Sequence, residues 1–216
     1  MKKIGIIGAG NIGMAIAKGM IRQNIVDPSQ LYLSRRRNGL LEKQGKEGFP
    51  ISDNQTLVDA CDTIVLAVLP GQAREVLLSL QSKLEGKLLI SVVSAVNIKE
   101  LKEWCGPSTE VVRVMPNTAV EYGASMTCIA GETDQAVKSV RDLFDPLGQT
   151  MVIKEQLMPA ATILAACGIA FFLRFIRAVS QGGIQIGFHA EEAGKIAAQT
   201  AMGAAELLMQ TENHPE

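Results

Sequence analysis

Short apolar runs alternate with amphipathic stretches over the first two thirds of the chain. The runs are apolar throughout, as parallel strands covered on both faces usually are, and the stretches between them carry apolar residues at helical spacing. Strands that alternate with helices of this length predict a mostly parallel sheet with helices on both faces, an α/β architecture. We predict strands at residues 4–7, 31–33, 63–68, 87–93, 110–114, 124–129 and 149–153, and helices at residues 12–23, 54–60, 72–84, 98–104 and 134–144.

The pattern changes after residue 154, where alanine, leucine, isoleucine and methionine dominate and no strand is evident. We predict an all-α segment of roughly three helices, the second at residues 169–187 and the third at 190–210. A helix that is apolar on most sides packs into a larger core or another subunit. The expected organisation is therefore a sheet domain at residues 1–154 and a helical domain at 155–216, which we expect to form a homodimer or a higher homo-oligomer.

Composition limits the classes of partner. Lys and Arg number 21 against 22 Asp and Glu, so no global charge favours nucleic acid or an anionic membrane. The four cysteines form no CxxC pair and the chain has two histidines, so we expect reduced thiols and no metal site. The N-terminal apolar run breaks at glycines, unlike a signal peptide. The most apolar stretch, residues 158–188, is interrupted by Arg174 and Arg177, so we expect a cytoplasmic protein without a membrane span.

A glycine motif follows the first predicted strand: Gly8-Ala9-Gly10-Asn11-Ile12-Gly13. In this strand–turn–helix context Gly8 permits a tight turn, Gly10 lets the backbone approach a pyrophosphate, and Gly13 lets the helix pack closely on the strand. The free N–H groups of the helix N-terminus attract phosphate. We therefore predict a Rossmann-type doubly wound fold that binds a dinucleotide; the alternative is a fold of this kind that has lost its ligand.

The end of the second strand distinguishes the two nicotinamide dinucleotides. NAD enzymes usually place Asp or Glu there, but this strand runs into Ser34-Arg35-Arg36-Arg37. A hydroxyl and guanidinium groups suit the 2′-phosphate of NADP. The alternative is a solvated basic turn, and its position after the second strand favours NADP(H).

Ligands of doubly wound sheets lie across the carboxyl ends of the strands. Ala67, Val68, Leu69 and Pro70, at the end of the strand predicted at 63–68, should therefore face the cofactor. Met115 and Asn117 follow the strand at 110–114 in the same way. Core packing for Met115 and a turn cap for Asn117 are equally compatible with the spacing.

Together these segments resemble the pyrroline-5-carboxylate reductase family, and the likeness spans nearly the whole chain. Arg-Val-Met-Pro-Asn-Thr, residues 113–118, is the most specific element. The other matching segments are residues 8–13, Asp53-Asn54, Leu66-Ala67-Val68 with Pro70, 197–205 and 212–215.

The resemblance implies NADPH-dependent reduction of the C=N bond of 1-pyrroline-5-carboxylate to L-proline, in proline biosynthesis, and a helical domain that interlocks with that of a partner. A protonated cyclic imine is already electrophilic, so the enzyme chiefly has to hold it about 3–3.5 Å from the hydride donor, and we identify no catalytic residue. The residues implied are Gly8, Gly10, Asn11 and Ile12 at the pyrophosphate; Ser34, Arg35 and Arg36 at the 2′-phosphate; Asn54 at the nucleotide; Ala67, Val68, Leu69, Pro70, Met115 and Asn117 at the nicotinamide; and Asn117, Cys167 and Gly168 at the substrate.

The chain departs from the family pattern at three places. Leu69 stands where the family usually has lysine, and Ala165-Ala166-Cys167-Gly168-Ile169-Ala170-Phe171 replaces Ser-Gly-Ser-Gly-Pro-Ala-Tyr. The Thr-Ser-Pro-Gly-Gly-Thr segment that holds the substrate carboxylate in the family is not found before Glu216. We therefore expect a divergent or C-terminally truncated member. The alternatives are a non-catalytic NADP-binding dimer and a related reductase acting on a different imine or carbonyl compound. Relatives that act on β-hydroxyacids use a lysine of the long helix as acid and base, and Lys195 is the one lysine within the helical segment here.

Overall fold

The computed structural model describes residues 3–36 and 41–211. The chain forms two compact units, residues 1–166 and 167–216. This division falls inside the helical run Glu155–Gln185, whereas the predicted boundary at 154/155 lies at the start of that run, twelve residues earlier. The two units are described separately.

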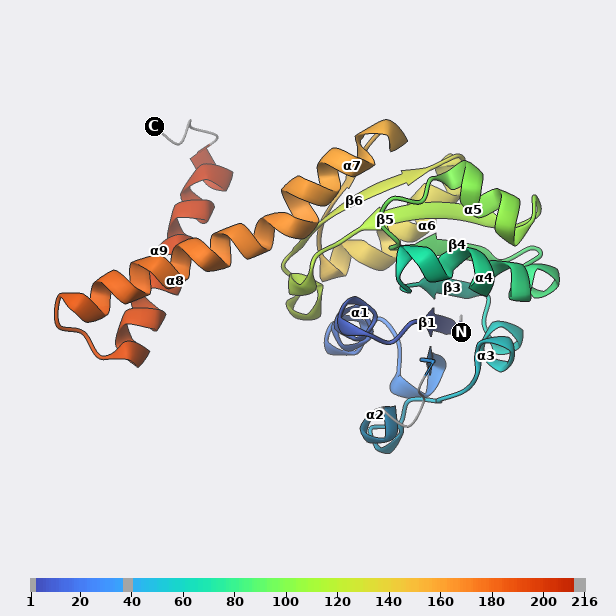
Figure 1. Cartoon of the computed structure of the whole chain (residues 1–216), viewed down its shortest axis with the longest axis horizontal. Coiled ribbons are helices and arrows are strands. Elements are labelled where there is room, and N and C mark those ends of the chain that lie inside the picture. The colour runs from blue at the N-terminus through green and yellow to red at the C-terminus, as the bar shows by residue number, and fades with distance from the viewer. Residues whose placement is uncertain (1–2, 37–40, 212–216) are drawn as a thin grey trace. The chain divides into compact units, whose positions relative to one another are not determined.

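The first unit is built on a seven-stranded sheet with the order β2-β1-β3-β4-β5-β6-β7 (Figure 1). Adjacent strands are parallel except β5 and β6, which run antiparallel. The mostly parallel, doubly wound sheet predicted from the apolar runs is confirmed. The strands are β1 (Ile4–Ile7), β2 (Leu31–Ser34), β3 (Thr63–Leu66), β4 (Leu88–Ser91), β5 (Glu110–Met115), β6 (Ser125–Gly131) and β7 (Gly148–Val152).

Helices cover both faces of the sheet because successive strand residues point to opposite sides. Ile6 packs into one apolar cluster with α1 and α6, whereas Ile7 packs into another with α3, α4 and α5. The helices of this unit are α1 (Asn11–Arg22), α2 (Glu42–Lys46), α3 (Asn54–Ala60), α4 (Pro70–Leu80), α5 (Ile98–Cys105), α6 (Asp134–Phe144) and α7 (Met158–Ala161), with 3₁₀ turns at Pro28–Gln30, Gln81–Lys83, Thr118–Tyr122, Asp145–Leu147 and Glu155–Leu157.

Two strands are shorter than predicted. β3 ends at Leu66 rather than Val68, and β4 ends at Ser91 rather than Val93. Helix α4 begins at Pro70, two residues before the predicted start. Proline suits the first position of a helix, because an N–H there would have no hydrogen-bond partner within the helix and proline has none. The segment after β3 is therefore a short loop, Ala67 to Leu69, at the carboxyl edge of the sheet.

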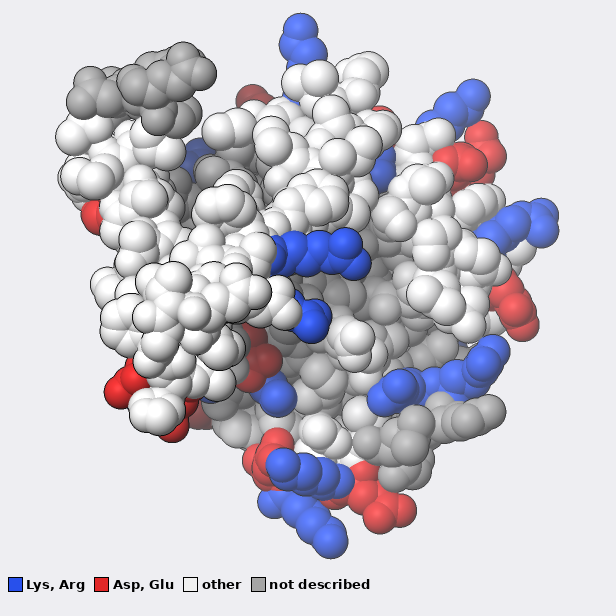
Figure 2. Space-filling model, turned by 60° about the vertical axis from the view of Figure 1, so that its left-hand side comes forward, with Lys and Arg blue, Asp and Glu red and all other residues white. Residues whose placement is uncertain are grey.

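The second unit is a pair of helices, α8 (Gly168–Gln185) and α9 (Ala190–Thr211). Their contact is close: a Cβ added to Gly183 would lie 3.1 Å from the Cβ of Ala193. Few other side chains in these helices are buried, and many large apolar ones are exposed. On the face in Figure 2, wide areas carry no charged side chain. The exposed apolar residues of α8 and α9 are Phe171, Phe172, Leu173, Phe175, Val179, Ile184, Ile196, Met202, Leu207, Leu208 and Met209.

One helical run in the described part of the chain, Glu155–Gln185, is long and apolar enough by length and composition to cross a membrane. This differs from the expectation drawn from the sequence, which treated Arg174 and Arg177 as interruptions. Two charged residues leave the mean hydropathy of the run high enough for a membrane-spanning helix. The same composition is required of a helix that is buried against another subunit.

Three of the cysteines, Cys61, Cys105 and Cys128, are unpaired and buried, whereas Cys167 is exposed. Burial raises the pKa of the Cys61 thiol from 9.0 to about 11, and it raises the pKa of the Cys105 and Cys128 thiols too. Because the thiolate is the reactive form, these thiols are protected both by burial and by protonation.

We expect Cys61, Cys105 and Cys128 to resist a thiol reagent at pH 8 in the folded protein, with all four cysteines labelled in urea. Mass spectrometry of the labelled peptides measures this. Since the pKa of Cys61 is raised on folding, its contribution to the free energy of unfolding is present below the ordinary value of 9.0 and is lost as the pH rises towards 11. Rapid labelling of Cys61 without denaturant would contradict its burial.

Candidate functional site

The turn after β1 requires glycine at two positions. Gly8 has φ +99°, a conformation that other residues rarely adopt. A Cβ on Gly8 would lie 2.5 Å from the carbonyl oxygen of Ala67, and one on Gly13 would lie 2.4 Å from the carbonyl oxygen of Gly8 and 3.2 Å from Cγ2 of Ile6. The tight turn and the close helix–strand packing predicted for these glycines are present.

Gly10 differs, because a Cβ there would have only the Gly8 carbonyl oxygen, 4.0 Å away, within reach. Gly10 is also the N-cap of α1, and it provides no side chain to bond the first N–H groups of the helix. The first turn of α1 contains no acidic residue. Open space beside uncapped N–H groups at a helix N-terminus suits an anionic group such as a pyrophosphate.

The glycine turn lies at the switch point of the sheet. β1 has β2 on one side and β3 on the other, so the chain leaves β1 in one direction and returns on the opposite side. The Ala67 N–H donates to the Ile7 carbonyl oxygen over 2.8 Å, which brings the loops after β1 and β3 side by side. Open sheets bind ligands in the crevice at such a point.

A cleft of about 290 Å³ opens beside the glycine turn. It brings together Gly10, Asn11 and Arg35, which were predicted from the sequence, with residues that were not. Asn11, Met14, Ala15 and Lys18 follow helical spacing along one face of α1, a signal that the sequence contained. Thr118, the last residue of the 113–118 motif, also lines the cleft, and the residues missed are Ala9, Met14, Ala15, Lys18 and Glu121.

Ser34 links three segments at the end of β2. Its carbonyl oxygen accepts the N–H groups of Gly8 and Ala9 at 3.0 and 2.9 Å. Its hydroxyl donates to Oδ1 of Asn54 over 2.7 Å, and the residue is 1% exposed. A hydroxyl has a single proton, so Ser34 can donate to a phosphate only by releasing Asn54.

Arg35 and Arg36 are exposed beyond Ser34, and Arg37 lies outside the described residues. The acidic residue Asp53 lies near Ser34, because it directly precedes Asn54, to which the Ser34 hydroxyl donates. Its carboxylate caps α3, accepting from the Thr56 N–H at 2.9 Å and from Oγ1 of Thr56 at 3.1 Å. The Thr56 bonds lower the pKa of Asp53. The Asp53 carboxylate therefore serves as the N-cap of α3.

The loop after β3 presents a different surface. Ala67 and Val68 are half-buried, whereas Leu69 and Pro70 are exposed, with Leu69 at 69%. Leu69 is the N-cap of α4 and offers no side-chain hydrogen bond to it. An apolar side chain that reaches into solvent here can cover a ligand lying across the strand ends.

Met115 and Asn117 have defined partners at the end of β5. The Met115 side chain is buried in a cluster with Met158 and Ala161, which favours the core-packing alternative for that side chain. Asn117 Oδ1 accepts the Ala119 N–H at 2.9 Å, as a turn cap does. The structure adds two contacts: the Asn117 N–H donates to the Ser125 hydroxyl over 3.1 Å, and Asn117 Nδ2 donates to the Ala165 carbonyl oxygen over 3.2 Å.

Ala165 lies in a π-helical segment, Thr162–Cys167, immediately before α8. Such segments are frequent at functional sites. Cys167 is exposed and Gly168 is buried, and both belong to the second unit. Their assignment to the substrate stays a prediction.

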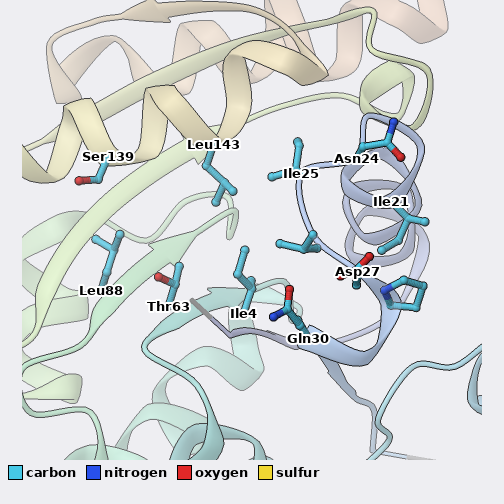
Figure 3. A pocket seen from close by; sticks show the side chains of 12 residues that line it. Ile4, Ile21, Asn24, Ile25, Asp27, Gln30, Thr63, Leu88, Ser139 and Leu143 are labelled. Atoms are coloured by element: carbon cyan, nitrogen blue, oxygen red, sulfur yellow. The ribbon is translucent and has the colours of Figure 1, made fainter. Parts of the chain in front are cut away.

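A larger cavity, about 470 Å³, lies elsewhere in the first unit (Figure 3). It is lined by Ile4, Thr63 and Leu88, which begin β1, β3 and β4. These are the amino ends of the strands, at the edge opposite the glycine turn. The cavity therefore does not meet the rule that places ligands at the carboxyl edge.

Two family models match separate parts of the chain. The model described as NADP oxidoreductase coenzyme F420-dependent matches residues 3–95. The model described as pyrroline-5-carboxylate reductase dimerisation matches residues 155–216. The first match covers β1 to β4 of the sheet, and the second begins with the helical run at Glu155.

Relatives match over nearly the whole chain. Pyrroline-5-carboxylate reductase 1 of Dictyostelium discoideum is 39% identical, over 99% of this chain and 42% of its own length. Pyrroline-5-carboxylate reductase 2 of the same organism is 39% identical, over 100% of this chain and 79% of its own length. This chain thus spans less than half of the first relative and about four fifths of the second.

The fold is similar to that of a solved structure. The crystal structure of Plasmodium falciparum pyrroline carboxylate reductase with NADP bound matches with a TM-score of 0.91 at 30% identity, over 99% of this chain and 81% of that chain. The resemblance carried by the motifs therefore extends to the fold.

Proposed function

Because the chain belongs to the pyrroline-5-carboxylate reductase family, we propose that it uses NADPH to reduce the C=N bond of 1-pyrroline-5-carboxylate, forming L-proline. The observation that carries the proposal is the glycine turn at the switch point of the sheet, with open space at Gly10 and an uncapped α1 N-terminus. The relative with NADP bound has the same fold.

The residues of the turn fit a dinucleotide. The N–H groups at the start of α1, at Asn11 and Ile12, would bind the pyrophosphate, with Gly8 and Gly10 keeping the backbone close to it. Arg35 and Arg36 would bind the 2′-phosphate, next to Ser34 and Asn54. Their exposure beside the α1 N-terminus supports this arrangement.

The nicotinamide end would lie across the loops after β3 and β5. Ala67, Val68, Leu69 and Pro70 would cover one side, and the segment from Met115 to Asn117 the other. Bound NADPH supplies the hydride for the C=N carbon. The chain's own part is to hold the imine against that donor and to exclude water, because a protonated imine needs no covalent activation.

The direct test is to incubate the protein with NADPH and 1-pyrroline-5-carboxylate, follow NADPH absorbance and identify proline chemically. We expect turnover that depends on both compounds. NADPH binding without proline would reject 1-pyrroline-5-carboxylate as the substrate and would leave a non-catalytic NADP-binding dimer or a reductase with a different imine or carbonyl substrate. Assays with other cyclic imines would separate these two.

The family model matched by residues 155–216 supports assembly of the chain with copies of itself. We assign the boundary between the cofactor domain and the assembly domain to 154/155, since that match begins at residue 155. The assembly would be a homodimer in which α8 and α9 bury their exposed apolar side chains. A soluble dimer of this kind, in the cytoplasm, accounts for the apolar run Glu155–Gln185 without a membrane.

Phe172 and Phe175 on α8, which are 70% and 66% exposed, should contribute strongly to such an interface. Burial of a Phe side chain contributes about 1.5–3 kcal/mol, so the double variant F172E/F175E should weaken the dimer by more than about 10²-fold. Light scattering coupled to size-exclusion chromatography measures the mass.

The matched control for the interface is L78E, which places an acid at an exposed apolar position on α4. We expect L78E to remain dimeric. A monomeric wild-type protein at micromolar concentration would contradict the assignment, and extraction of the wild type only by detergent would point to the membrane instead.

A further inference from the structure

Arg113 is the one charged residue buried among those that the structure describes. It lies in β5, two residues before Met115, and is 5% exposed. A charged side chain is rarely buried to this extent unless it has a partner. The role of Arg113 therefore depends on what it contacts.

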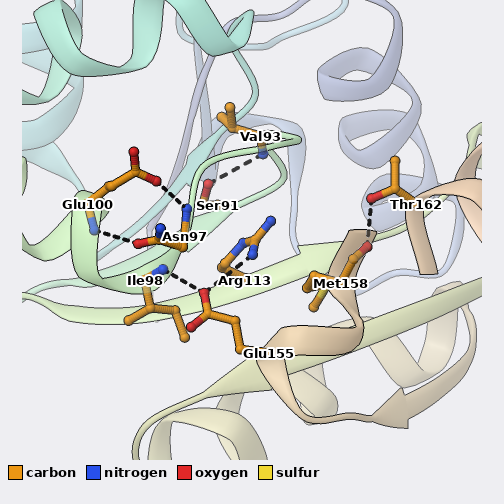
Figure 4. Close-up of polar contacts among 9 residues, drawn as sticks. All are labelled: Ser91, Val93, Asn97, Ile98, Glu100, Arg113, Glu155, Met158 and Thr162. Atoms are coloured by element: carbon orange, nitrogen blue, oxygen red, sulfur yellow. Dashed lines mark hydrogen bonds and ion pairs between the residues drawn. The ribbon is translucent and has the colours of Figure 1, made fainter. Parts of the chain in front are cut away.

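The partner of Arg113 is Glu155, at the start of the helical run that follows β7 (Figure 4). The Nη1 atom of Arg113 lies 3.3 Å from Oε1 of Glu155, and the same oxygen accepts the Ile98 N–H over 2.6 Å. Ile98 is the first residue of α5, whose own N-cap, Asn97, forms a capping box with Glu100. Glu155 thus connects β5, the start of α5 and the start of the helical run.

β5 and the loop that follows it contact the helical run at three places. Alternate strand residues point to one side of the sheet, as Arg113 and Met115 do, and Asn117 lies in the loop directly after the strand. Arg113 pairs with Glu155, Met115 packs in one cluster with Met158 and Ala161, and Asn117 bonds to the carbonyl of Ala165. All of these residues lie within the first unit.

The contact of Asn117 is at the π-helical segment Thr162–Cys167. Asn117 also lies in the loop that the proposed function assigns to the nicotinamide. A shift of the helical run along β5 would therefore pull the Asn117 amide with it. The ion pair lies at the other end of the same contact and opposes such a shift.

We propose that Arg113, through its ion pair with Glu155, is a positioning residue that holds the Asn117 loop in register for the nicotinamide end of NADPH. The proposal rests on the proposed function for the identity of the cofactor. Arg113 acts through Glu155 and the helical run rather than by touching the cofactor. Its flat guanidinium suits this role, since it fixes direction as well as charge.

The test uses the full chain and the variants R113M and E155Q. R113M removes the charge and keeps an apolar stem of similar length, and E155Q keeps an acceptor for the Ile98 N–H while removing the negative charge. R141M is the matched control, because Arg141 makes an exposed ion pair with Asp145 on the far side of the sheet from α5. Dissociation constants are measured for NADPH and for 2′,5′-ADP, which has the adenosine half only.

We expect R113M to raise the dissociation constant for NADPH several-fold, with that for 2′,5′-ADP unchanged. The kcat for imine reduction should fall on the order of 10²-fold, as expected for a small misplacement of reacting groups. E155Q should act in the same direction. R113M in the E155Q background should add little, because the pair is already broken. Hydrogen exchange at residues 158–166 should become faster in both variants and stay unchanged in R141M.

Equal weakening of both ligands would indicate a general loss of folded protein and would overturn the proposal, as would unchanged hydrogen exchange at 158–166. Unchanged NADPH binding and kcat in a less stable protein would also overturn it, since Arg113 would then be structural only. If the wild type forms no proline, the reductase function fails by itself. The ratio of the two dissociation constants and the exchange rates then still decide the role of Arg113.

Discussion

Replacing Arg35 and Arg36 together by alanine should raise the dissociation constant for NADPH by about 10²-fold, since each charge-assisted bond to an exposed phosphate contributes about 1.5 kcal/mol. The dissociation constant for NADH should hardly change, because NADH has no 2′-phosphate. Both side chains are exposed beside Ser34, whose backbone holds the glycine turn. Isothermal titration calorimetry with the two cofactors measures the difference.

The salt dependence of binding gives a second measurement on the same variants. Exposed charge pairs are screened as ionic strength rises, so NADPH affinity of the wild type should fall with added salt more steeply than that of R35A/R36A. K138A/R141A is the control, since it removes two cations from α6. An equal loss of NADPH and NADH affinity in R35A/R36A would show that the arginines hold the fold of the turn rather than the 2′-phosphate.

The second large effect separates two glycines of the same motif. In G13A the new methyl would lie 2.4 Å from the Gly8 carbonyl oxygen, which is backbone and cannot rotate away. Helix α1 would have to move off β1, and overpacking of this kind costs about 1–3 kcal/mol of the free energy of unfolding. Urea denaturation measures that loss.

G10A should behave in the opposite way. Its methyl meets no atom closer than 4.0 Å, so the fold should lose little more than the N-cap preference for glycine over alanine, about 1 kcal/mol or less. The methyl would stand where the pyrophosphate approaches, and a clash of about 1–3 kcal/mol weakens NADPH binding by about 10- to 10²-fold.

The control for both glycine variants is G45A in α2, where a Cβ would lie an ordinary 3.7 Å from Ile51. We expect G45A to keep both stability and NADPH affinity. A G10A protein that binds NADPH like the wild type would place the pyrophosphate elsewhere, and a G13A protein of unchanged stability would show that α1 can shift freely.

The succession of strands and helices along the chain, and the place of the glycine turn, could be predicted from the sequence. Buried parallel strands are apolar along their length, and this signal is local, so β1 and helices α3 and α6 lie where predicted. The roles of Gly8 and Gly13 were also predictable, because a strand followed by this motif and a helix allows only a close turn and close packing.

Only the fold shows which polar groups already have hydrogen-bond partners within the protein and which can bind a ligand. Ser34 and Asn54 are 20 residues apart, and their bond occupies the hydroxyl that the sequence assigned to a phosphate. Asn117 and Ala165 are 48 residues apart. No short-range pattern reports such pairs, because each depends on how the chain returns to the sheet.

The partner of Arg113 was likewise not predictable from the sequence. Its place in a specific motif was visible, but its function as the partner of Glu155 was not, since 42 residues and two strands separate them. Hydrophobic periodicity records which face of an element is buried. It does not record which distant segment covers that face, and at β5 that segment carries the carboxylate that makes a buried arginine possible.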